Sequence, residues 1–348
     1  MLPGGALPPP TGATVTRIAL GPHRAVVADP ATIAVYERAR RLARATVPVV
    51  IHGETGSGKE LVAAALHAYG PRAGGPFVAL NCAAIPDSLA EAELFGHARG
   101  AFTGATSARD GMIEAASGGT LFLDEIAELS LATQARLLRA LEVGEVCRIG
   151  ETVARKVDVR VVCASLVDLA AAVAAGRLRQ DLYFRLGAAR IELPPLRARP
   201  LDLAALTAAF VADACVRLGR PPLGVDADAT AALARHPWPG NVRELRHVLE
   251  CAVALAADDA TGLTAADLPL AVTAAPATPA PPPTFRPVAD ELEELERRRM
   301  VEALAAAAGV QIAAAGLIGM PIRTFATKLR RYGIDPADAP REAAVRCR

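Results

Sequence analysis

A glycine-rich turn between an apolar run and a helical pattern restricts the fold more than any other feature of this chain. The apolar run TVPVVIHG (46–53) leads into GETGSGKE (53–60), and LVAAALHAY (61–69) follows. Glycines allow consecutive backbone N–H groups to converge on phosphate oxygens, and the N-terminus of the next helix adds partial positive charge. The sequence therefore predicts a strand, a phosphate-binding loop (P-loop) and a helix, in that order.

The predicted P-loop contains Lys59, one of only three lysines in the chain. A lysine at this position reaches the β- and γ-phosphates of a nucleotide, so ATP with Mg²⁺ is the expected ligand. Glu60 stands where the general pattern has a hydroxyl that meets Mg²⁺. The residues expected to bind the nucleotide here are Gly53, Glu54, Thr55, Gly56, Ser57, Gly58, Lys59 and Glu60.

Four further apolar runs alternate with helical patterns along the chain, at 76–82, 119–125, 159–165 and 189–195. Strands that alternate with helices are typical of a parallel sheet in an α/β fold. We therefore predict a parallel five-stranded sheet. From about Leu201 the sequence becomes helical and rich in Ala and Leu, with no strand signal, which predicts a helical lid packed on the sheet.

Two segments rich in Pro, Gly or Ala, 1–12 and 273–288, cannot build a core. They flank one large unit, and a small unit follows the second segment. The predicted parts are a short N-terminal extension (1–24), an α/β part (25–200), a helical lid (201–270), a Pro/Ala-rich linker (271–289) and a C-terminal unit with its tail (290–348).

The run GGTLFLDEI (118–126) is a predicted buried strand that ends in two acidic residues, Asp124 and Glu125. Ligands of open α/β sheets bind at the carboxyl ends of the strands. Asp124 is therefore the expected ligand of Mg²⁺, and Glu125 is expected to polarise the water that attacks the γ-phosphate. With Lys59, this pair predicts an ATPase.

The segment between the P-loop and the acidic strand contains GAFTGA, an expected exposed loop tip. Together with GETGSGKE and LNCAAIPDSLAEAELFGHARGAFTGA (80–105), it resembles the AAA+ central domain of bacterial enhancer-binding proteins, the sigma-54 activators. The resemblance covers about residues 25 to 270. It implies a loop that contacts sigma-54 through Gly100, Ala101, Phe102, Thr103, Gly104 and Ala105.

The same resemblance implies roles for four further residues. Asn81 would be the switch that restrains Glu125 until the γ-phosphate is sensed. Arg179 and Arg185, in LRQDLYFRL (178–186), would be arginine fingers that act on ATP in the neighbouring subunit. Arg243, in HPWPGNVREL (236–245), would contact the nucleotide from the lid. A homo-oligomeric ring is thus implied, and the family suggests a hexamer.

Three positions depart from the family pattern. Ser165 keeps a hydroxyl at the end of the apolar run 159–165, but Leu166 follows where the family has a polar residue. A leucine side chain donates no hydrogen bond, which predicts an altered coupling between the γ-phosphate and the loop. Ala98 replaces a usual acidic residue, and Ala28-Asp29-Pro30 lacks a usual glycine.

The C-terminal unit is strongly basic. Residues 297–333 hold seven basic residues and one acidic residue. A helix that ends at Gly309, then a helix, a turn at Gly319 and a helix opened by Pro321, resemble the Fis-type helix-turn-helix of enhancer-binding proteins. The alternative is a basic amphipathic hairpin that serves only dimerisation. The residues expected to face DNA are Arg323, Thr324, Thr327, Lys328, Arg330 and Arg331.

Membrane and export signals are missing from the sequence. No apolar run approaches the ~20 residues of a membrane span, and MLPGGALPPP lacks the basic start and apolar core of a signal peptide. A cytoplasmic location is expected.

Only some 25 residues precede the central domain, which predicts control by a separate protein in trans or by expression level, unless a misplaced start codon hides an upstream domain.

These patterns together predict an ATP-dependent transcription activator that binds enhancer DNA and remodels sigma-54 RNA polymerase holoenzyme into the open complex. One alternative is a non-hydrolysing DNA-binding regulator on the same fold, which Leu166 favours. The other is an AAA+ remodeller with a different client, against which GAFTGA and the helix-turn-helix argue.

Overall fold

The computed structural model describes residues 15–102, 107–270 and 288–335, and the chain divides into two compact units, Met1–Val272 and Thr273–Arg348. Among the residues described, no helix has both the length and the apolar character that a membrane span requires.

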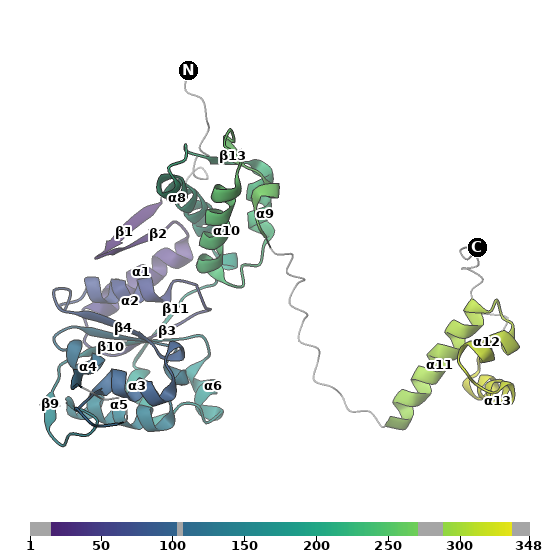
Figure 1. Cartoon of the computed structure of the whole chain (residues 1–348), viewed down its shortest axis with the longest axis horizontal. Coiled ribbons are helices and arrows are strands. Elements are labelled where there is room, and N and C mark those ends of the chain that lie inside the picture. Colours follow the sequence, from purple (N-terminus) through teal and green to yellow (C-terminus); the bar gives the residue numbers. More distant parts are fainter. Residues whose placement is uncertain (1–14, 103–106, 271–287, 336–348) are drawn as a thin grey trace. The chain divides into compact units, whose positions relative to one another are not determined.

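The first unit is built on a five-stranded sheet in which every neighbouring pair is parallel (Figure 1). The strand order is β11-β3-β10-β7-β4. All five predicted strands and their parallel arrangement are confirmed. Their bounds are Val49–His52 for β3, Phe77–Asn81 for β4, Thr120–Asp124 for β7, Arg160–Ser165 for β10 and Ala189–Glu192 for β11.

Helices cover both faces of this sheet (Figure 1). Val49 and Ile51 pack on one side with α1 (Pro30–Ala43) and α2 (Lys59–Ala68), whereas Val50 between them packs on the other side. A strand buried on both faces needs an unbroken apolar run, which the sequence has. The other side carries α3 (Asp87–Phe95), α4 (Met112–Ala115), α5 (Leu131–Val143), α6 (Leu169–Ala174) and α7 (Gln180–Leu186).

Three antiparallel hairpins surround the sheet, and sequence reasoning did not find them. The hairpin β1–β2 lies partly in the predicted N-terminal extension, and Leu20, Ala25 and Val27 bury their side chains in the core beside α1 and α2. The bounds are Thr16–Leu20 and His23–Val27 for β1 and β2, Gly96–His97 and Arg109–Asp110 for β5 and β6, and Glu145–Cys147 and Ala154–Lys156 for β8 and β9.

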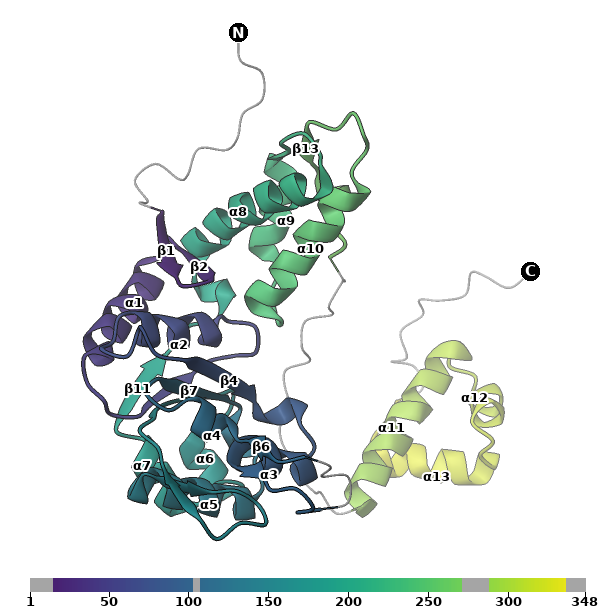
Figure 2. The ribbon, with the colours of Figure 1, turned by 60° about the vertical axis from the view of Figure 1, so that its left-hand side comes forward.

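The helical lid has its own core around Trp238, which is fully buried and donates its indole N–H to Leu233 O at 2.9 Å. Figure 2 shows its three helices, α8 (Pro200–Leu218), α9 (Ala227–Arg235) and α10 (Asn241–Leu255). The expectation that this part contains no strand was wrong, because β12 (Gly224–Val225) pairs with β13 (Gly262–Leu263).

The second unit consists of three described helices, α11 (Val288–Ala306), α12 (Gln311–Leu317) and α13 (Ile322–Tyr332). Gly319 adopts φ +64° in the turn between the last two, and Pro321 stands directly before α13, as predicted. Met300, Leu304, Phe325 and Leu329 form the centre of its core. The fold is the expected helix-turn-helix preceded by a longer helix.

Arg160 joins three elements at the amino end of the sheet, opposite the P-loop edge. Its guanidinium is buried and donates to the carbonyls of Leu42, Ala43 and Leu66 at 2.9, 2.7 and 3.3 Å. These carbonyls lie near the ends of helices α1 and α2, where intrahelical donors run out; Leu42 O also accepts the backbone N–H of Ala45 at 3.2 Å. The side chain therefore anchors both helices to β10.

We expect Arg160→Met to lower the free energy of unfolding by about 2 to 3 kcal/mol, because it leaves buried carbonyls without donors. Urea denaturation measures this loss. Arg177→Met is the matched control, since Arg177 is 49% exposed and lies 4.0 Å from its partner Glu128; it should cost less than about 0.5 kcal/mol. Equal losses in the two variants would contradict the anchoring role of Arg160.

Candidate nucleotide site, loop and basic helix

The P-loop connects β3 to α2 and places Lys59 at its end, as the first residue of α2. Gly56 and Gly58 adopt φ +73° and +106°, values that favour glycine, and α2 begins at Lys59. Lys59 is only 6% exposed, and its Nζ donates to Gly53 O at 2.9 Å and to Glu125 Oε1 at 3.1 Å. The predicted lysine and the predicted catalytic carboxylate are therefore in direct contact.

Asp124 lies at the carboxyl end of β7, beside Asn81 of β4. Its Oδ1 is buried and has no hydrogen-bond donor, and burial raises the pKa of this carboxyl while the charge of Lys59 opposes the rise. A buried carboxylate oxygen without a donor, at the strand edge beside the P-loop, fits a hard divalent cation such as Mg²⁺. Glu60, at the hydroxyl position, is exposed.

Glu125 has a backbone conformation that few glutamates adopt, with φ +54° and ψ +53°. This turn directs its carboxylate across the strand ends. Oε1 contacts Lys59, and Oε2 accepts a hydrogen bond from the backbone N–H of Leu166 at 2.9 Å. The expectation that Leu166 donates nothing holds only for its side chain, because its backbone N–H fixes Glu125.

Asn81 shares the strand edge with the acidic pair. Its side-chain oxygen accepts a hydrogen bond from Ala83 N at 3.0 Å, which caps a short turn after β4. Between residues 15 and 270, where described, no hydrogen bond links Asn81 to Glu125. The switch role of Asn81 stays a prediction.

The lid contacts the P-loop directly. A Cβ on Gly56 would lie 2.3 Å from Gly240 O and 3.1 Å from the Cβ of Arg243, so Arg243 begins beside the loop, and its contact with the nucleotide stays a prediction. Val242 N donates to Gly56 O at 3.0 Å. Sequence reasoning missed three other residues whose side chains reach the loop, Arg197, Arg199 and Asn241. The available signal was the Gly-Asn-Val-Arg start of α10.

The loop that carries GAFTGA leaves the hairpin β5–β6. Phe102 is 40% exposed, and its ring lies 5.0 Å from that of His97 in an edge-to-face arrangement. Gly100 adopts φ +80°, and Ala101 follows it. Thr103, Gly104 and Ala105 lie outside the described residues.

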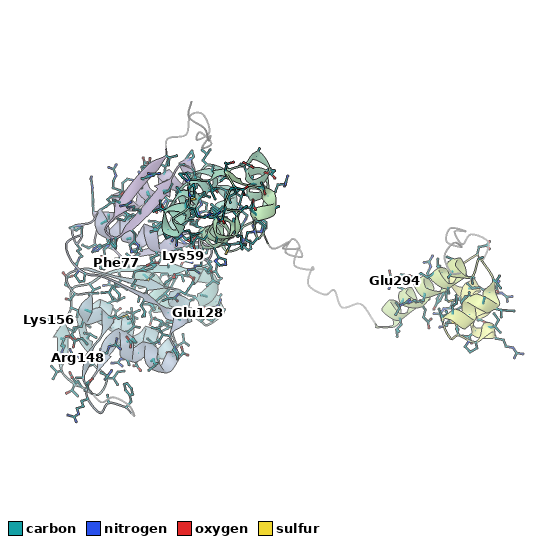
Figure 3. All side chains as sticks on the ribbon, turned by 45° about the horizontal axis from the view of Figure 1, so that its top comes forward. Lys59, Phe77, Glu128, Arg148, Lys156 and Glu294 are labelled. Carbon is teal, nitrogen blue, oxygen red and sulfur yellow. The ribbon has the colours of Figure 1, made fainter. Side chains whose placement is uncertain are left out.

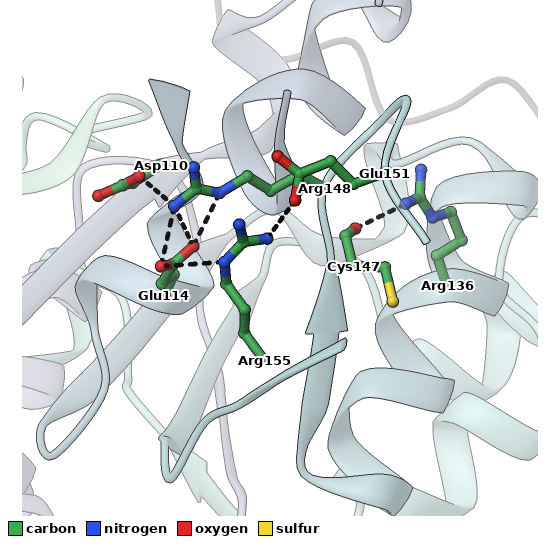
Figure 4. Close-up of polar contacts among 7 residues, drawn as sticks. All are labelled: Asp110, Glu114, Arg136, Cys147, Arg148, Glu151 and Arg155. Atoms are coloured by element: carbon green, nitrogen blue, oxygen red, sulfur yellow. Dashed lines mark hydrogen bonds and ion pairs between the residues drawn. The ribbon is translucent and has the colours of Figure 1, made fainter. Parts of the chain in front are cut away.

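A second hairpin, β8–β9, supports the base of this loop. Ile149 exchanges backbone hydrogen bonds with Gly96 and Ala98, each 2.9 Å long. Figure 4 shows the ion pairs around this base: Arg148 contacts Asp110 of β6 and Glu114 of α4, and Arg155 contacts the same Glu114 and Glu151 of its own hairpin. In Figure 3, Lys59 lies beneath the lid, whereas Arg148 and Lys156 lie on the side of the unit away from it.

The two predicted arginine fingers lie at the surface around α7. Arg179 pairs with Asp181 at 2.7 Å, and Arg185 donates to Leu141 O at 2.9 Å. Both are exposed, as is Phe184 between them at 68%. Their partners belong to their own surface and not to the P-loop, which is compatible with action on another molecule.

In the second unit, five of the six predicted DNA-binding residues are exposed, and Lys328 is half-buried. The ammonium of Lys328 forms an ion pair with Glu296 of α11, and Tyr332 donates to the same carboxylate at 2.9 Å. Arg331 lies 3.4 Å from Glu293. Lys328 thus holds α13 against α11. The exposed residues are Arg323, Thr324, Thr327, Arg330 and Arg331.

A parallel α/β sheet with a P-loop, an acidic strand end and a helical lid defines the AAA+ class of P-loop nucleotide-binding proteins. Family models agree with this class. Residues 25–192 match the sigma-54 interaction domain, residues 197–283 the AAA+ ATPase lid domain, and residues 291–332 the Fis family of bacterial regulatory proteins. The chain belongs to the family of bacterial sigma-54-dependent transcription regulators.

Curated relatives share this organisation. The C4-dicarboxylate transport transcriptional regulatory protein DctD of Rhizobium meliloti is 44% identical over 87% of this chain and 64% of its own length. The response regulator protein PilR of Pseudomonas aeruginosa is 42% identical over 90% of this chain and 70% of its own. The Nif-specific regulatory protein of Azotobacter vinelandii is 44% identical, and the chain spans 57% of its length.

Solved structures resemble the fold as well. NtrX of Brucella abortus in complex with ATP is 32% identical, covers 89% of this chain and 70% of its own length, and has a TM-score of 0.67. The same protein in complex with ADP has a TM-score of 0.66 and 31% identity. The P-loop arrangement thus belongs to a fold whose solved relatives include nucleotide complexes.

We expect Gly56→Ala to destabilise the first unit more than Gly176→Ala. Both glycines have positive φ, +73° and +69°, but only Gly56 faces a nearby carbonyl, whereas Gly176 has no atom within 4 Å. The left-handed conformation alone costs an alanine about 1 to 2 kcal/mol, and the contact with Gly240 O should add about 1 to 3 kcal/mol. Urea denaturation of both variants measures the difference. Equal losses would contradict the close contact between lid and loop.

Proposed function

We propose that this chain hydrolyses ATP in a homo-oligomeric ring and uses the hydrolysis to convert sigma-54 RNA polymerase holoenzyme from the closed to the open promoter complex. The observation that carries the proposal is the connected set Lys59, Glu125 and Leu166 N–H at the carboxyl edge of the sheet, beside Asp124. A regulator that only binds DNA has no need of this set.

The chemistry rests on positioned charge. Lys59 Nζ would leave Glu125 to contact the β- and γ-phosphates, which releases Glu125 Oε1 to accept a hydrogen bond from the attacking water. The Leu166 N–H would keep Oε2 in place during this exchange. Asp124 Oδ1 would hold Mg²⁺, which, when bound, offsets negative charge on the phosphates.

A second subunit would complete the site. Arg179 and Arg185 are exposed and form contacts only with their own surface among the described residues, so they are available to the ATP of a neighbouring subunit. A guanidinium supplied in trans raises turnover by about 10³ to 10⁵. Hydrolysis would then depend on assembly, and the family resemblance favours a ring of six.

The loop around Phe102 is the proposed contact with sigma-54, and Thr103 would share it. Phe102 is exposed on the loop that leaves the hairpin β5–β6, and β8–β9 supports the base of that loop. The basic second unit would bind enhancer DNA, and a separate protein acting in trans would control the activator in the cytoplasm.

The non-hydrolysing DNA-binding regulator is less well supported. The sequence feature that favours it is Leu166, whose side chain donates no hydrogen bond. The backbone N–H of Leu166 donates to Glu125, and this contact does not depend on the side chain. Lys59, Asp124 and Glu125 are also all present at the strand edge.

We expect ATP turnover that rises cooperatively with protein concentration and falls at least about 100-fold in Glu125→Gln, because an amide cannot accept the proton of water. Phosphate release measures turnover. Glu128→Gln is the matched control, since Glu128 is 51% exposed and 4.0 Å from Arg177, and it should retain wild-type turnover.

The same preparations should be mixed with sigma-54 holoenzyme on a premelted promoter and scored for open complexes. Wild type and Glu128→Gln are expected to produce them, and Glu125→Gln is not. Absence of turnover at every concentration of the wild-type chain would refute the hydrolytic proposal and favour the DNA-binding regulator.

We expect Arg330→Gln to weaken binding of a labelled DNA duplex and to lower the slope of log affinity against log salt by about 1, because one phosphate contact is lost. Lys328→Gln should leave this slope unchanged, since the Lys328 ammonium is paired with Glu296. Fluorescence anisotropy over a salt series measures both. If the two variants lowered the slope equally, Lys328 would be a DNA contact.

A further inference from the structure

Four consecutive P-loop residues hydrogen-bond to the lid or to the short segment that precedes it. The first is Glu54, whose carboxylate accepts two hydrogen bonds from Arg197, at 2.6 and 2.8 Å, and a third from Asn241 Nδ2 at 3.0 Å. Arg197 belongs to the short helix η3 (Leu196–Ala198), and Asn241 is the first residue of α10. The hydrogen bonds from Arg197 and Asn241 lower the pKa of Glu54, although burial acts in the opposite direction. This carboxylate is therefore charged.

The next three residues offer their backbone carbonyls. Thr55 O accepts from Asn241 Nδ2 at 3.1 Å. Gly56 O accepts from Val242 N at 3.0 Å. Ser57 O accepts from Arg199 Nη2 at 3.0 Å. Each of these three carbonyls therefore accepts a hydrogen bond from the lid or from the segment that precedes it.

The direction of these carbonyls determines where the loop N–H groups point. In a planar trans peptide the C=O of one residue and the N–H of the next are antiparallel. Asn241 and Arg199 hold the carbonyls of Thr55 and Ser57 towards the lid, so the N–H groups of Gly56 and Gly58 point to the opposite side. That is the side on which a P-loop binds phosphate.

Asn241 is suited to this task in a way that few residues are. It is fully buried and adopts φ +51°, a conformation that Asn tolerates better than most side chains. Its Oδ1 accepts from Leu196 N at 2.7 Å while its Nδ2 donates to Glu54 and Thr55. A carboxylate at this position would still accept the N–H of Leu196, but it could not donate to Glu54 or Thr55. Its negative charge would also repel Glu54.

Arg199 extends the contact to the start of the α/β part. It is buried, and it lies 3.5 Å from Asp202, whose Oδ1 accepts the N–H groups of Ala28 and Asp29 at 2.7 and 2.8 Å. Asp29 in turn caps α1 through Ala31 N at 3.0 Å. The P-loop, the lid and the entry to the sheet thus share one buried polar network.

We infer that Asn241, with Arg197 and Arg199, positions the P-loop for phosphate by holding the outer groups of Glu54, Thr55 and Ser57. This inference rests on the proposed function and concerns how its nucleotide site is formed. The residues are positioning residues, since none of them need touch the nucleotide. Because the network precedes hydrolysis, its loss should affect nucleotide affinity more than the rate at saturation.

The test is the dissociation constant of a fluorescent ADP analogue with Mg²⁺, measured on the full chain. Asn241→Asp should raise it about tenfold or more, because the new carboxylate faces Glu54. Glu54→Gln combined with Asn241→Asp should recover most of the loss, since a glutamine amide donates to the new carboxylate. Arg197→Gln, a change at the surface, should raise the constant about threefold.

Arg217→Gln is the matched control for Arg197→Gln. Arg217 makes a similar pair with Glu250 at 2.7 Å within the lid, but it does not contact the P-loop, and the variant should bind like the wild type. In ATP turnover, Asn241→Asp should raise KM by the same factor as the dissociation constant and change kcat by less than about twofold.

Two results would overturn the inference. The first is wild-type affinity in both Asn241→Asp and Arg197→Gln. The second is a loss in Asn241→Asp that Glu54→Gln does not recover, because a merely structural defect would not depend on the charge of Glu54. Failure of the wild-type chain and of Arg217→Gln to bind the analogue is a different result, and it would refute the proposed function itself.

Discussion

The parallel direction of the five strands is the constraint on which the site depends. Parallel strands bring their carboxyl ends to one edge, so residues far apart in sequence meet there: the P-loop after β3, Asn81 at the end of β4, the acidic pair at the end of β7 and Leu166 after β10. The central strands β3, β7 and β10 are buried on both faces, which leaves their ends as the place where polar side chains reach solvent or a ligand. The site follows from this topology.

The contact between Lys59 and Glu125 gives that edge its chemistry. A buried ammonium needs a partner, and here it shares Glu125 with the backbone N–H of Leu166. Glu125 reaches both only because its backbone adopts a left-handed conformation at the strand end. A strained residue held by two partners is a common feature of sites in which one partner is exchanged for a ligand.

The lid and the hairpins β5–β6 and β8–β9 attach to opposite sides of the sheet, and polar contacts add to apolar packing at each attachment. On one side, Asn241 and Arg199 occupy the outer carbonyls of the P-loop. On the other, Arg148 and Arg155 tie β8–β9 to the base of the loop that carries Phe102 (Figure 4). Apolar cores hold each layer together, and charged contacts connect the parts that carry ligands.

The sequence by itself determined the five strands, the P-loop, the acidic pair and the helix-turn-helix, because each depends on a local pattern of apolar, glycine or charged residues. It also predicted the family, through motifs in a defined order. Only the tertiary structure showed that Leu166 acts through its backbone, that Asn241 and Arg199 hold the P-loop, and that Lys328 pairs within its own unit. A backbone donor has no sequence signature, and partners 32 to 187 residues apart meet only when the chain folds.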